Sequence, residues 1–163
     1  HSDRYLEKFS VLQHPESTSE LCAEFARRFA DDDIQLVVGP ATGGILLAFE
    51  TARQMGVRSL FTEREEGKMQ FRRGFSFEPG ERILIVEDIV TTGGSVVEVI
   101  EAVEAWEGTI VGIGLLADRS GGTVEFGYRT EPLMRLDIEA WQPEDCPLCK
   151  RDVPFTERGS RRL

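Results

Sequence analysis

Two adjacent carboxylates stand between an apolar run and a glycine-rich segment in the middle of this chain. Residues 83–86 are Ile-Leu-Ile-Val, Glu87 and Asp88 follow them, and residues 91–95 are Thr-Thr-Gly-Gly-Ser. Where a strand turns tightly into a helix, backbone N–H groups and short hydroxyls surround a phosphate, and glycine lets the backbone approach it closely. Carboxylates beside such a turn accept hydrogen bonds from sugar hydroxyls. The segment therefore predicts a site for a sugar phosphate.

Two further glycine-bearing segments follow apolar runs of strand length. Residues 39–44 come after the run 34–38, and residues 118–122 come after the run 109–117. Continuous apolar runs of this length are typical of strands that are buried on both faces of a parallel sheet. Strands are therefore predicted at 34–38, 58–62, 83–86 and 109–117.

Apolar residues at helical spacing predict helices between these strands, at 17–31, 45–55 and 96–108. The first helix begins with the capping-box pair Ser17 and Glu20, and Gly56 and Gly108 are the stop signals of the other two. Strands that alternate with helices predict an α/β fold with a central, mainly parallel sheet flanked by helices. Ligands bind at the carboxyl ends of the strands in such sheets, so the three glycine segments should converge on one crevice.

Residues 63–74 have the densest charge and no steady apolar period, which predicts a mobile loop between two strands. Their basic side chains are Arg64, Lys68, Arg72 and Arg73. A small strand is expected at 75–77, before the turn at 78–81.

Composition limits the class of protein. The 163 residues fit one domain, 1–163, and 40% hydrophobic residues are enough for a packed core. A net charge of -10 argues against generic binding of nucleic acid or of an anionic membrane, so neither is expected as a partner. The apolar runs are far shorter than the roughly 20 residues that span a bilayer.

Three cysteines are too few for a disulfide framework, which favours a cytoplasmic protein. Cys146 and Cys149 have the spacing of half a zinc site, but no second pair exists. A structural tail or a labile disulfide is the preferred interpretation, and a zinc ion shared across a dimer is the alternative. The sequence begins at His1 without Met, so we expect an amino-terminal segment to be absent from it.

The segment 83–95 resembles the 5-phosphoribosyl 1-diphosphate (PRPP) signature of the type I phosphoribosyltransferases. Four apolar residues, two acids, two apolar residues, Thr-Thr-Gly-Gly and a hydroxyl follow one another as in that motif. The rest of the chain is similar to the orotate phosphoribosyltransferases of this superfamily. Residues 1–9 resemble their amino-terminal base-site stretch, 39–44 their diphosphate loop, 63–74 their mobile catalytic loop, and 118–119 their orotate-binding pair.

The resemblance implies a fold and an activity. The fold is the type I phosphoribosyltransferase fold with a small hood from the terminal segments, whose amino-terminal helix has no counterpart in this sequence. The activity is the transfer of phosphoribose from PRPP to orotate, with release of diphosphate, in pyrimidine biosynthesis. Mg²⁺ is the implied cofactor, held mainly through substrate and water rather than by direct protein ligands. The implied assembly is a homodimer whose mobile loop acts on the neighbouring subunit's site.

The resemblance also assigns roles to residues. Catalysis is implied for Asp88 and, across the dimer, for Arg64 and Lys68, whose charge would stabilise the leaving diphosphate. The implied PRPP site comprises Glu87, Asp88, Ile89, Val90, Thr91, Thr92, Gly93, Gly94 and Ser95, with Thr42 and Gly43. The implied orotate site comprises Thr91, Arg119, His1 and Lys8. The Arg119 guanidinium fork suits the orotate carboxylate.

The mobile loop departs from the family pattern. Better-known members have Arg-Lys at its start and a His near its middle, where this chain has Arg64 followed by Glu65, and Gln70. This removes two cationic groups, and replacement by Arg72 and Arg73 is a hypothesis.

Two other functions are also compatible with the PRPP motif. A purine or uracil phosphoribosyltransferase would share the PRPP motif, but only orotate offers a carboxylate to Arg119. A non-catalytic regulator that binds PRPP and RNA is disfavoured by the net charge of -10 and by the lack of a basic face. Trp106 and Trp141 are expected to be packing residues.

Overall fold

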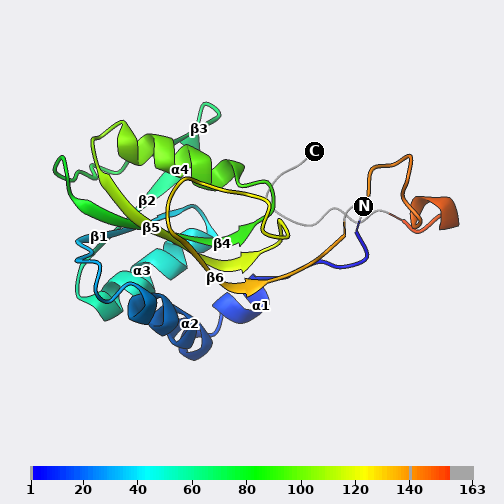
Figure 1. The fold of residues 1–163 in the computed structure, drawn as a ribbon, viewed down its shortest axis with the longest axis horizontal. Coiled ribbons are helices and arrows are strands. Elements are labelled where there is room, and N and C mark those ends of the chain that lie inside the picture. The colour runs from blue at the N-terminus through cyan, green and yellow to red at the C-terminus, as the bar shows by residue number, and fades with distance from the viewer. Residues whose placement is uncertain (1, 140, 155–163) are drawn as a thin grey trace. The chain divides into compact units, whose positions relative to one another are not determined.

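The computed structural model describes residues 2–139 and 141–154 (Figure 1). The chain divides into two compact units, one formed by Glu7–Leu136 and the other by the two terminal segments, His1–Leu6 with Asp137–Leu163. In the smaller unit the terminal segments contact each other, since the Ser2 hydroxyl donates to the Glu139 carbonyl at 2.8 Å. This unit also contains the short helix η1 (Cys149–Arg151).

A six-stranded sheet forms the centre of the larger unit. Its strands are β1 (Leu36–Pro40), β2 (Arg58–Glu65), β3 (Lys68–Phe71), β4 (Arg82–Val90), β5 (Thr109–Asp118) and β6 (Thr130–Arg135). They lie in the order β3-β2-β1-β4-β5-β6, and every neighbouring pair is parallel except β2 with β3. The mainly parallel sheet predicted from the sequence is confirmed.

The larger unit also contains helices α1 (Phe9–Leu12), α2 (Pro15–Arg28), α3 (Gly43–Met55) and α4 (Gly94–Glu104). Helices α2 and α3 cover one face of the sheet and α4 covers the other (Figure 1). Successive strand residues point to opposite faces. In β4, Ile83 and Ile85 therefore pack in the core under α4, while Leu84 and Val86 pack in the core under α2 and α3. Burial on both faces explains the continuous apolar runs.

The strands extend further than the sequence predicted. Strand β4 continues through Glu87 and Asp88, because β5 is long enough to pair with it as far as Val90 opposite Asp118. The acid pair thus lies within a strand, not in the loop after it. Strand β1 likewise reaches Pro40, inside the expected glycine loop.

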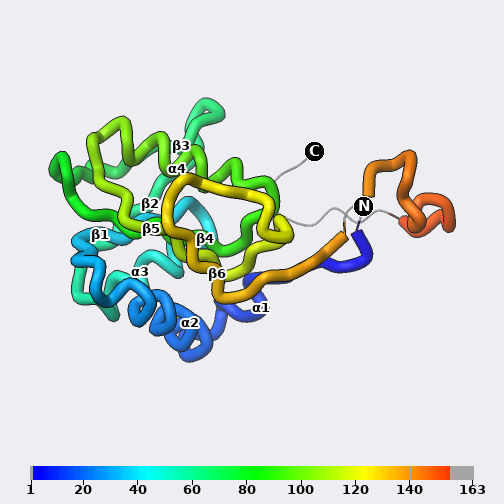
Figure 2. Tube along the Cα trace, in the orientation of Figure 1, coloured from blue at the N-terminus to red at the C-terminus, as the bar shows by residue number. Residues whose placement is uncertain are grey.

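A mobile loop was predicted at 63–74, and its secondary structure differs from that prediction, because residues 63–65 and 68–71 lie in strands. Strands β2 and β3 form an antiparallel hairpin, with Glu65 opposite Lys68. Glu66 and Gly67 both have positive φ, 48° and 84°, as in the two-residue turns that match the twist of a hairpin. Strand β3 lies next to α4 (Figure 2).

Three other local expectations also need correction. Residues 75–77 are not a strand; the Phe75 ring instead packs edge-on against Phe61 at 5.0 Å. Helix α2 begins at Pro15 rather than at the capping box, because proline is well suited to a first helical position. Strand β6 was not predicted at all.

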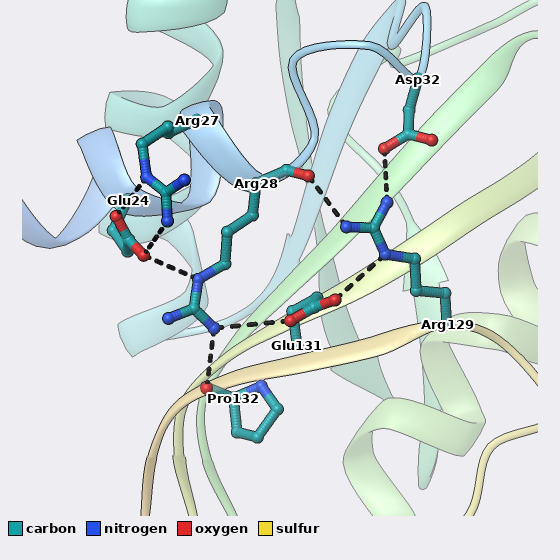
Figure 3. Close-up of polar contacts among 7 residues, drawn as sticks. All are labelled: Glu24, Arg27, Arg28, Asp32, Arg129, Glu131 and Pro132. Carbon is teal, nitrogen blue, oxygen red and sulfur yellow. Dashed lines mark hydrogen bonds and ion pairs between the residues drawn. The ribbon is translucent and has the colours of Figure 1, made fainter.

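A network of charged side chains joins β6 to the end of α2 (Figure 3). Its residues are Glu24, Arg27, Arg28, Asp32, Arg129 and Glu131, with the Pro132 carbonyl. Arg129 donates to the Asp32 carboxylate at 2.8 Å and to the Arg28 carbonyl at 2.9 Å. Its guanidinium also lies 4.7 Å from the centroid of the Phe29 ring. The network holds the start of the edge strand β6, at the amino ends of the parallel strands and away from the predicted crevice.

No helix among the described residues has the length and apolar character needed to cross a membrane.

Candidate active site

The loops that follow β1, β4 and β5 converge at one edge of the sheet, as predicted. The Arg119 N–H donates to the Val90 carbonyl at 2.8 Å, which joins the ends of β5 and β4. A Cβ atom at position 43 would overlap Oδ2 of Asp88, so α3 begins directly against the acid pair. Glycine is required at position 43 for this close approach.

Glu87 and Asp88 are both buried, with 6% and 3% of their surfaces exposed. The Asp88 N–H donates to Oε1 of Glu87 at 2.8 Å, and the Ile89 N–H donates to Oδ1 of Asp88 at 2.6 Å. Nζ of Lys8 lies 2.6 Å from Oδ2 of Asp88. Burial, together with the adjacent Asp88 carboxylate, raises the pKa of Glu87 to about 8. The pair therefore holds a proton at neutral pH, and one lysine faces it.

The turn after β4 leads into α4 through Gly93, which has a φ of 79°. A Cβ atom there would lie 2.7 Å from Val124 and 2.9 Å from Phe126, so the loop after β5 packs directly on the turn. Thr91 and Thr92 are exposed, and the first N–H groups of α4 have no acceptors within the helix. Such an end of a helix favours an anion.

Arg119 stands at the end of β5 with its side chain half-buried. Its Nε atom is buried and has no hydrogen-bond partner among the described residues. The neighbouring Asp118 carboxylate does not serve it, because its Oδ1 accepts from both the N–H and the hydroxyl of Ser120, at 2.8 and 2.6 Å. A buried guanidinium N–H without a partner is costly, so this position favours an anionic ligand.

Comparisons with known proteins agree with this geometry. A family model described as "Phosphoribosyl transferase domain" matches residues 10–131. The chain is 53% identical to an orotate phosphoribosyltransferase of Desulforamulus reducens and 55% identical to one of Pelotomaculum thermopropionicum. The first match covers all of this chain and 85% of that relative, and the second covers all of this chain and 86% of the relative. The chain belongs to the orotate phosphoribosyltransferase family.

Solved structures of the phosphoribosyltransferases share the fold. The chain superposes on the orotate phosphoribosyltransferase of Mycobacterium tuberculosis in complex with Fe(III) dicitrate with a TM-score of 0.70 and 22% identity, over 83% of this chain and 82% of the other. An adenine phosphoribosyltransferase from Rhodothermus marinus gives a TM-score of 0.68 and 23% identity, over 82% and 87%. The type I phosphoribosyltransferase fold predicted from the sequence is confirmed.

The segment that resembles the family's catalytic loop forms the β2–β3 hairpin in this protein, and most of its cations are paired. Arg73 forms two bonds of 2.7 Å with Glu63, and Arg72 lies 3.0 Å from Glu65. Arg64 reaches back to Glu98 of α4, at 2.5 Å. Among the cations of the hairpin, Lys68 is the one without an ion-pair partner in the part of the chain that the structure describes.

The structure brings some of the expected site residues together and leaves others apart. Lys8, Gly43, Glu87 and Asp88 meet at one point, and Arg119 is bonded to the same strand. The Val90 side chain packs in the core, so only its backbone faces the crevice. Thr42 is exposed at the start of α3 and Gly94 begins α4. Ser95 follows in the first turn of α4, and His1 lies outside the described residues.

Sequence reasoning missed two contacts. The pairing of Lys8 with Asp88 was not predicted, and nothing in the sequence marks Glu98 as the partner of Arg64. Trp106 is a packing residue, as predicted, with its ring 5.0 Å from that of Phe71.

The Cys146 and Cys149 motif lies in the smaller unit, where the Cys149 N–H donates to Sγ of Cys146 at 3.3 Å. Among residues 2–139 and 141–154, no three His, Cys, Asp or Glu side chains gather as a metal site would require.

Proposed function

We propose that this protein transfers the phosphoribosyl group of PRPP to orotate, giving orotidine 5′-monophosphate and diphosphate in pyrimidine biosynthesis. The observation that supports it most directly is Arg119, whose buried Nε has no hydrogen-bond partner within residues 2–139 and 141–154 and which lies beside the acid pair and the glycine turn. A carboxylate on the base would supply that partner. Neutral purines and uracil have none, which is why orotate is preferred over them.

The two ends of PRPP match two parts of the crevice. The 5-phosphate is assigned to the turn at 91–95, where N–H groups and the hydroxyls of Thr91 and Thr92 are available. The ribose hydroxyls are assigned to Glu87 and Asp88. The diphosphate is assigned to the segment with Thr42 and Gly43, which abuts Asp88.

Transfer needs no protein nucleophile. A ring nitrogen of orotate bonds to C1 of the ribose while the bond from C1 to the diphosphate oxygen breaks, its electron pair leaves with diphosphate, and the nitrogen's proton passes to water. Negative charge at Asp88 favours the positive charge that develops on the sugar. Lys68, and Arg64 once it leaves Glu98, stabilise the negative charge on the leaving group. Positioning of the two reactants supplies much of the remaining rate.

The residues around the acid pair fit a magnesium ion, because the donors there are carboxylate and hydroxyl oxygens, which this ion prefers. Asp88 and the Thr91 and Thr92 hydroxyls would order the water around an ion held mainly by substrate. When bound, magnesium neutralises charge on the diphosphate.

A homodimer is part of the proposal, with Lys68 acting on the partner's site. Helices α1 and α3 are in contact, and their exposed apolar side chains are available to a second copy: Phe9, Val11, Leu46 and Phe49. Phe49 is the most exposed of them, at 64%. Burial of such a surface is the usual driving force for a symmetric dimer. The terminal unit is assigned to the family's hood, as part of one phosphoribosyltransferase domain.

The surroundings proposed for the enzyme are the cytoplasm, with small-molecule substrates and no nucleic-acid or membrane partner. The three cysteines form no disulfide with one another, and burial raises the pKa of the Cys22 thiol to about 11, as in a core residue. Fractionation of cells and an RNA-binding assay at defined salt test this part.

A panel of bases tests the function. Protein, Mg²⁺ and PRPP are mixed with orotate, uracil, adenine, guanine or hypoxanthine, and diphosphate release is measured for each. We expect diphosphate release with orotate and with none of the other four bases. Release with a purine or with uracil but not with orotate would replace the proposed substrate, and tight RNA binding without release would favour a regulator.

A further inference from the structure

Lys8 is held against the acid pair by the short helix that follows it. The Lys8 carbonyl accepts the N–H groups of Val11 and Leu12, at 3.1 and 3.0 Å, and the Leu12 side chain is buried in the core under α3. The Lys8 Nζ also lies 5.4 Å from the centroid of the Phe9 ring. Backbone anchoring and a ring contact thus direct one lysine to one oxygen, Oδ2 of Asp88.

We propose that Lys8 is a positioning residue: it holds the Asp88 carboxylate in the direction of the ribose hydroxyls and balances the charge of the acid pair while PRPP is absent. This inference rests on the proposed function, since it assigns a role at the same ribose site.

Three contacts fix the Asp88 carboxylate from different elements. The Ile89 N–H holds Oδ1 from β4, Lys8 holds Oδ2 from the start of α1, and Gly43 of α3 limits where Oδ2 can move. A carboxylate oxygen has two lone pairs, so Oδ2 can accept a ribose hydroxyl without losing Lys8. Lys8 therefore orients the group that binds substrate and does not need to be displaced.

Among the described residues, Lys8 is the cation that pairs with Asp88. On β4 the neighbour is Glu87, which is acidic, and α3 approaches Asp88 at Gly43, which carries no charge. On β5, Asp118 is bonded to Ser120 and Arg119 contacts β4 through its backbone. The Lys8 charge lowers the pKa of Glu87, against the stronger opposite effects of burial and Asp88. Loss of Lys8 therefore makes the second negative charge of the pair harder to form.

A melting experiment without substrate tests the pairing. We compare Lys8→Met with Lys150→Met, a matched change at an exposed lysine of the smaller unit, between pH 5.5 and 9. The loss of melting temperature in Lys8→Met should grow as pH rises, because Glu87 then ionises with no cation to balance it. A loss that is equal at every pH would mean that Lys8 does not balance the charge that forms on Glu87, and the proposal would fail.

Kinetics test the positioning role. In Lys8→Met the KM for PRPP should rise about tenfold at pH 7, and the acidic limb of kcat/KM should move up by about one pH unit. Lys8→Arg should restore much of both, and Lys150→Met should match the parent protein. A rise confined to the KM for orotate would place Lys8 in the base site and overturn the proposal. If the parent protein did not use orotate, the proposed function would fail, while the melting experiment would still decide the Lys8 pairing.

Discussion

At the scale of single residues, the site depends on ionisable side chains whose surroundings make their charged forms unfavourable. Glu87 is buried beside another carboxylate, and Arg119 is half-buried with its Nε unpaired among the described residues. Buried polar groups without partners are costly to a folded protein, so they are expected where a ligand completes them. Both residues give predictions that a substrate-free or a kinetic experiment can check.

The first prediction concerns stability and pH. Glu87 has a folded pKa of about 8, above its ordinary value of 4.5, so the folded state keeps a proton that the unfolded state loses. Stability contributed by this proton is fully present below about pH 4.5 and is lost as pH rises toward 8. Glu87→Gln, which resembles the protonated form, should raise the melting temperature at pH 8 by about 2–6 °C and have little effect near pH 5.

The control for that change is Glu101→Gln, at an exposed position of α4. Its effect should be small and should not grow between pH 5 and pH 8. If Glu87→Gln lowered the melting temperature most at pH 8, Glu87 would be ionised and stabilising there, contrary to its assigned surroundings.

The second prediction concerns the choice of base. Arg119→Ala should weaken the use of orotate by about 2–4 kcal/mol, the scale for loss of a charged partner at a desolvated contact, and leave the KM for PRPP nearly unchanged. Steady-state kinetics with each substrate varied in turn measure both quantities. Arg27→Ala, at an exposed arginine of α2, is the control. A selective rise in the KM for PRPP would instead assign Arg119 to the sugar-phosphate site.

At the scale of elements, the site depends on how closely the start of a helix approaches a strand. Helix α3 begins at Gly43 against Asp88, and Gly93, the residue before α4, packs closely against Val124 and Phe126. The hairpin adds a separate element beside α4, closed by Glu66 and Gly67. The close approach at Gly43 and Gly93 leaves no room for a Cβ atom, so one added methyl group would change the geometry of the site.

The third prediction follows from that approach. Gly43→Ala should place its methyl group on Asp88 and push the carboxylate away, which should reduce kcat/KM by about 10²-fold and cost about 1–3 kcal/mol of stability. Activity assays and chemical unfolding measure the two effects. Gly80→Ala, whose methyl group meets open space but whose φ of 80° is strained for alanine, controls for the cost of losing a glycine without a clash with Asp88. Full activity in Gly43→Ala would mean that the position of Asp88 is not critical.

Much of this architecture could be predicted from the sequence, and the exceptions have physical causes. The motif at 83–95 is local, so its strand, turn and helix were predicted and found. The hairpin was missed because charged residues obscured the alternation of Met69 and Phe71 on β3. Strand β6 was missed because an edge strand that is only partly buried has no continuous apolar run. The Lys8–Asp88 pair joins distant parts of the chain, and no local pattern encodes it.

At the scale of the whole molecule, catalysis is expected to depend on two copies of the chain. The acid pair and Lys68 belong to different elements, and no contact between them is found among the described residues of one copy. The apolar surface of α1 and α3 provides a place for association, and Phe49 is its most exposed side chain.

The fourth prediction tests this dependence. Lys68→Ala and Asp88→Asn should each reduce activity by about 10²-fold or more, because each removes a charge used in the transition state. Mixed after subunit exchange, the two inactive proteins should recover part of the activity, since a hybrid dimer has one intact site. Exchange is monitored with differently labelled chains. Demonstrated exchange without recovery would mean that Lys68 acts on its own subunit.

The proton held by Glu87 has a consequence for the heat of substrate binding. Ribose hydroxyls donate to a carboxylate most favourably when it is ionised, so binding of PRPP should expel this proton into the buffer near neutral pH. The measured enthalpy should then vary with the ionisation enthalpy of the buffer, and the slope counts the protons released. Recognition of the sugar would thereby be linked to the pH of the medium.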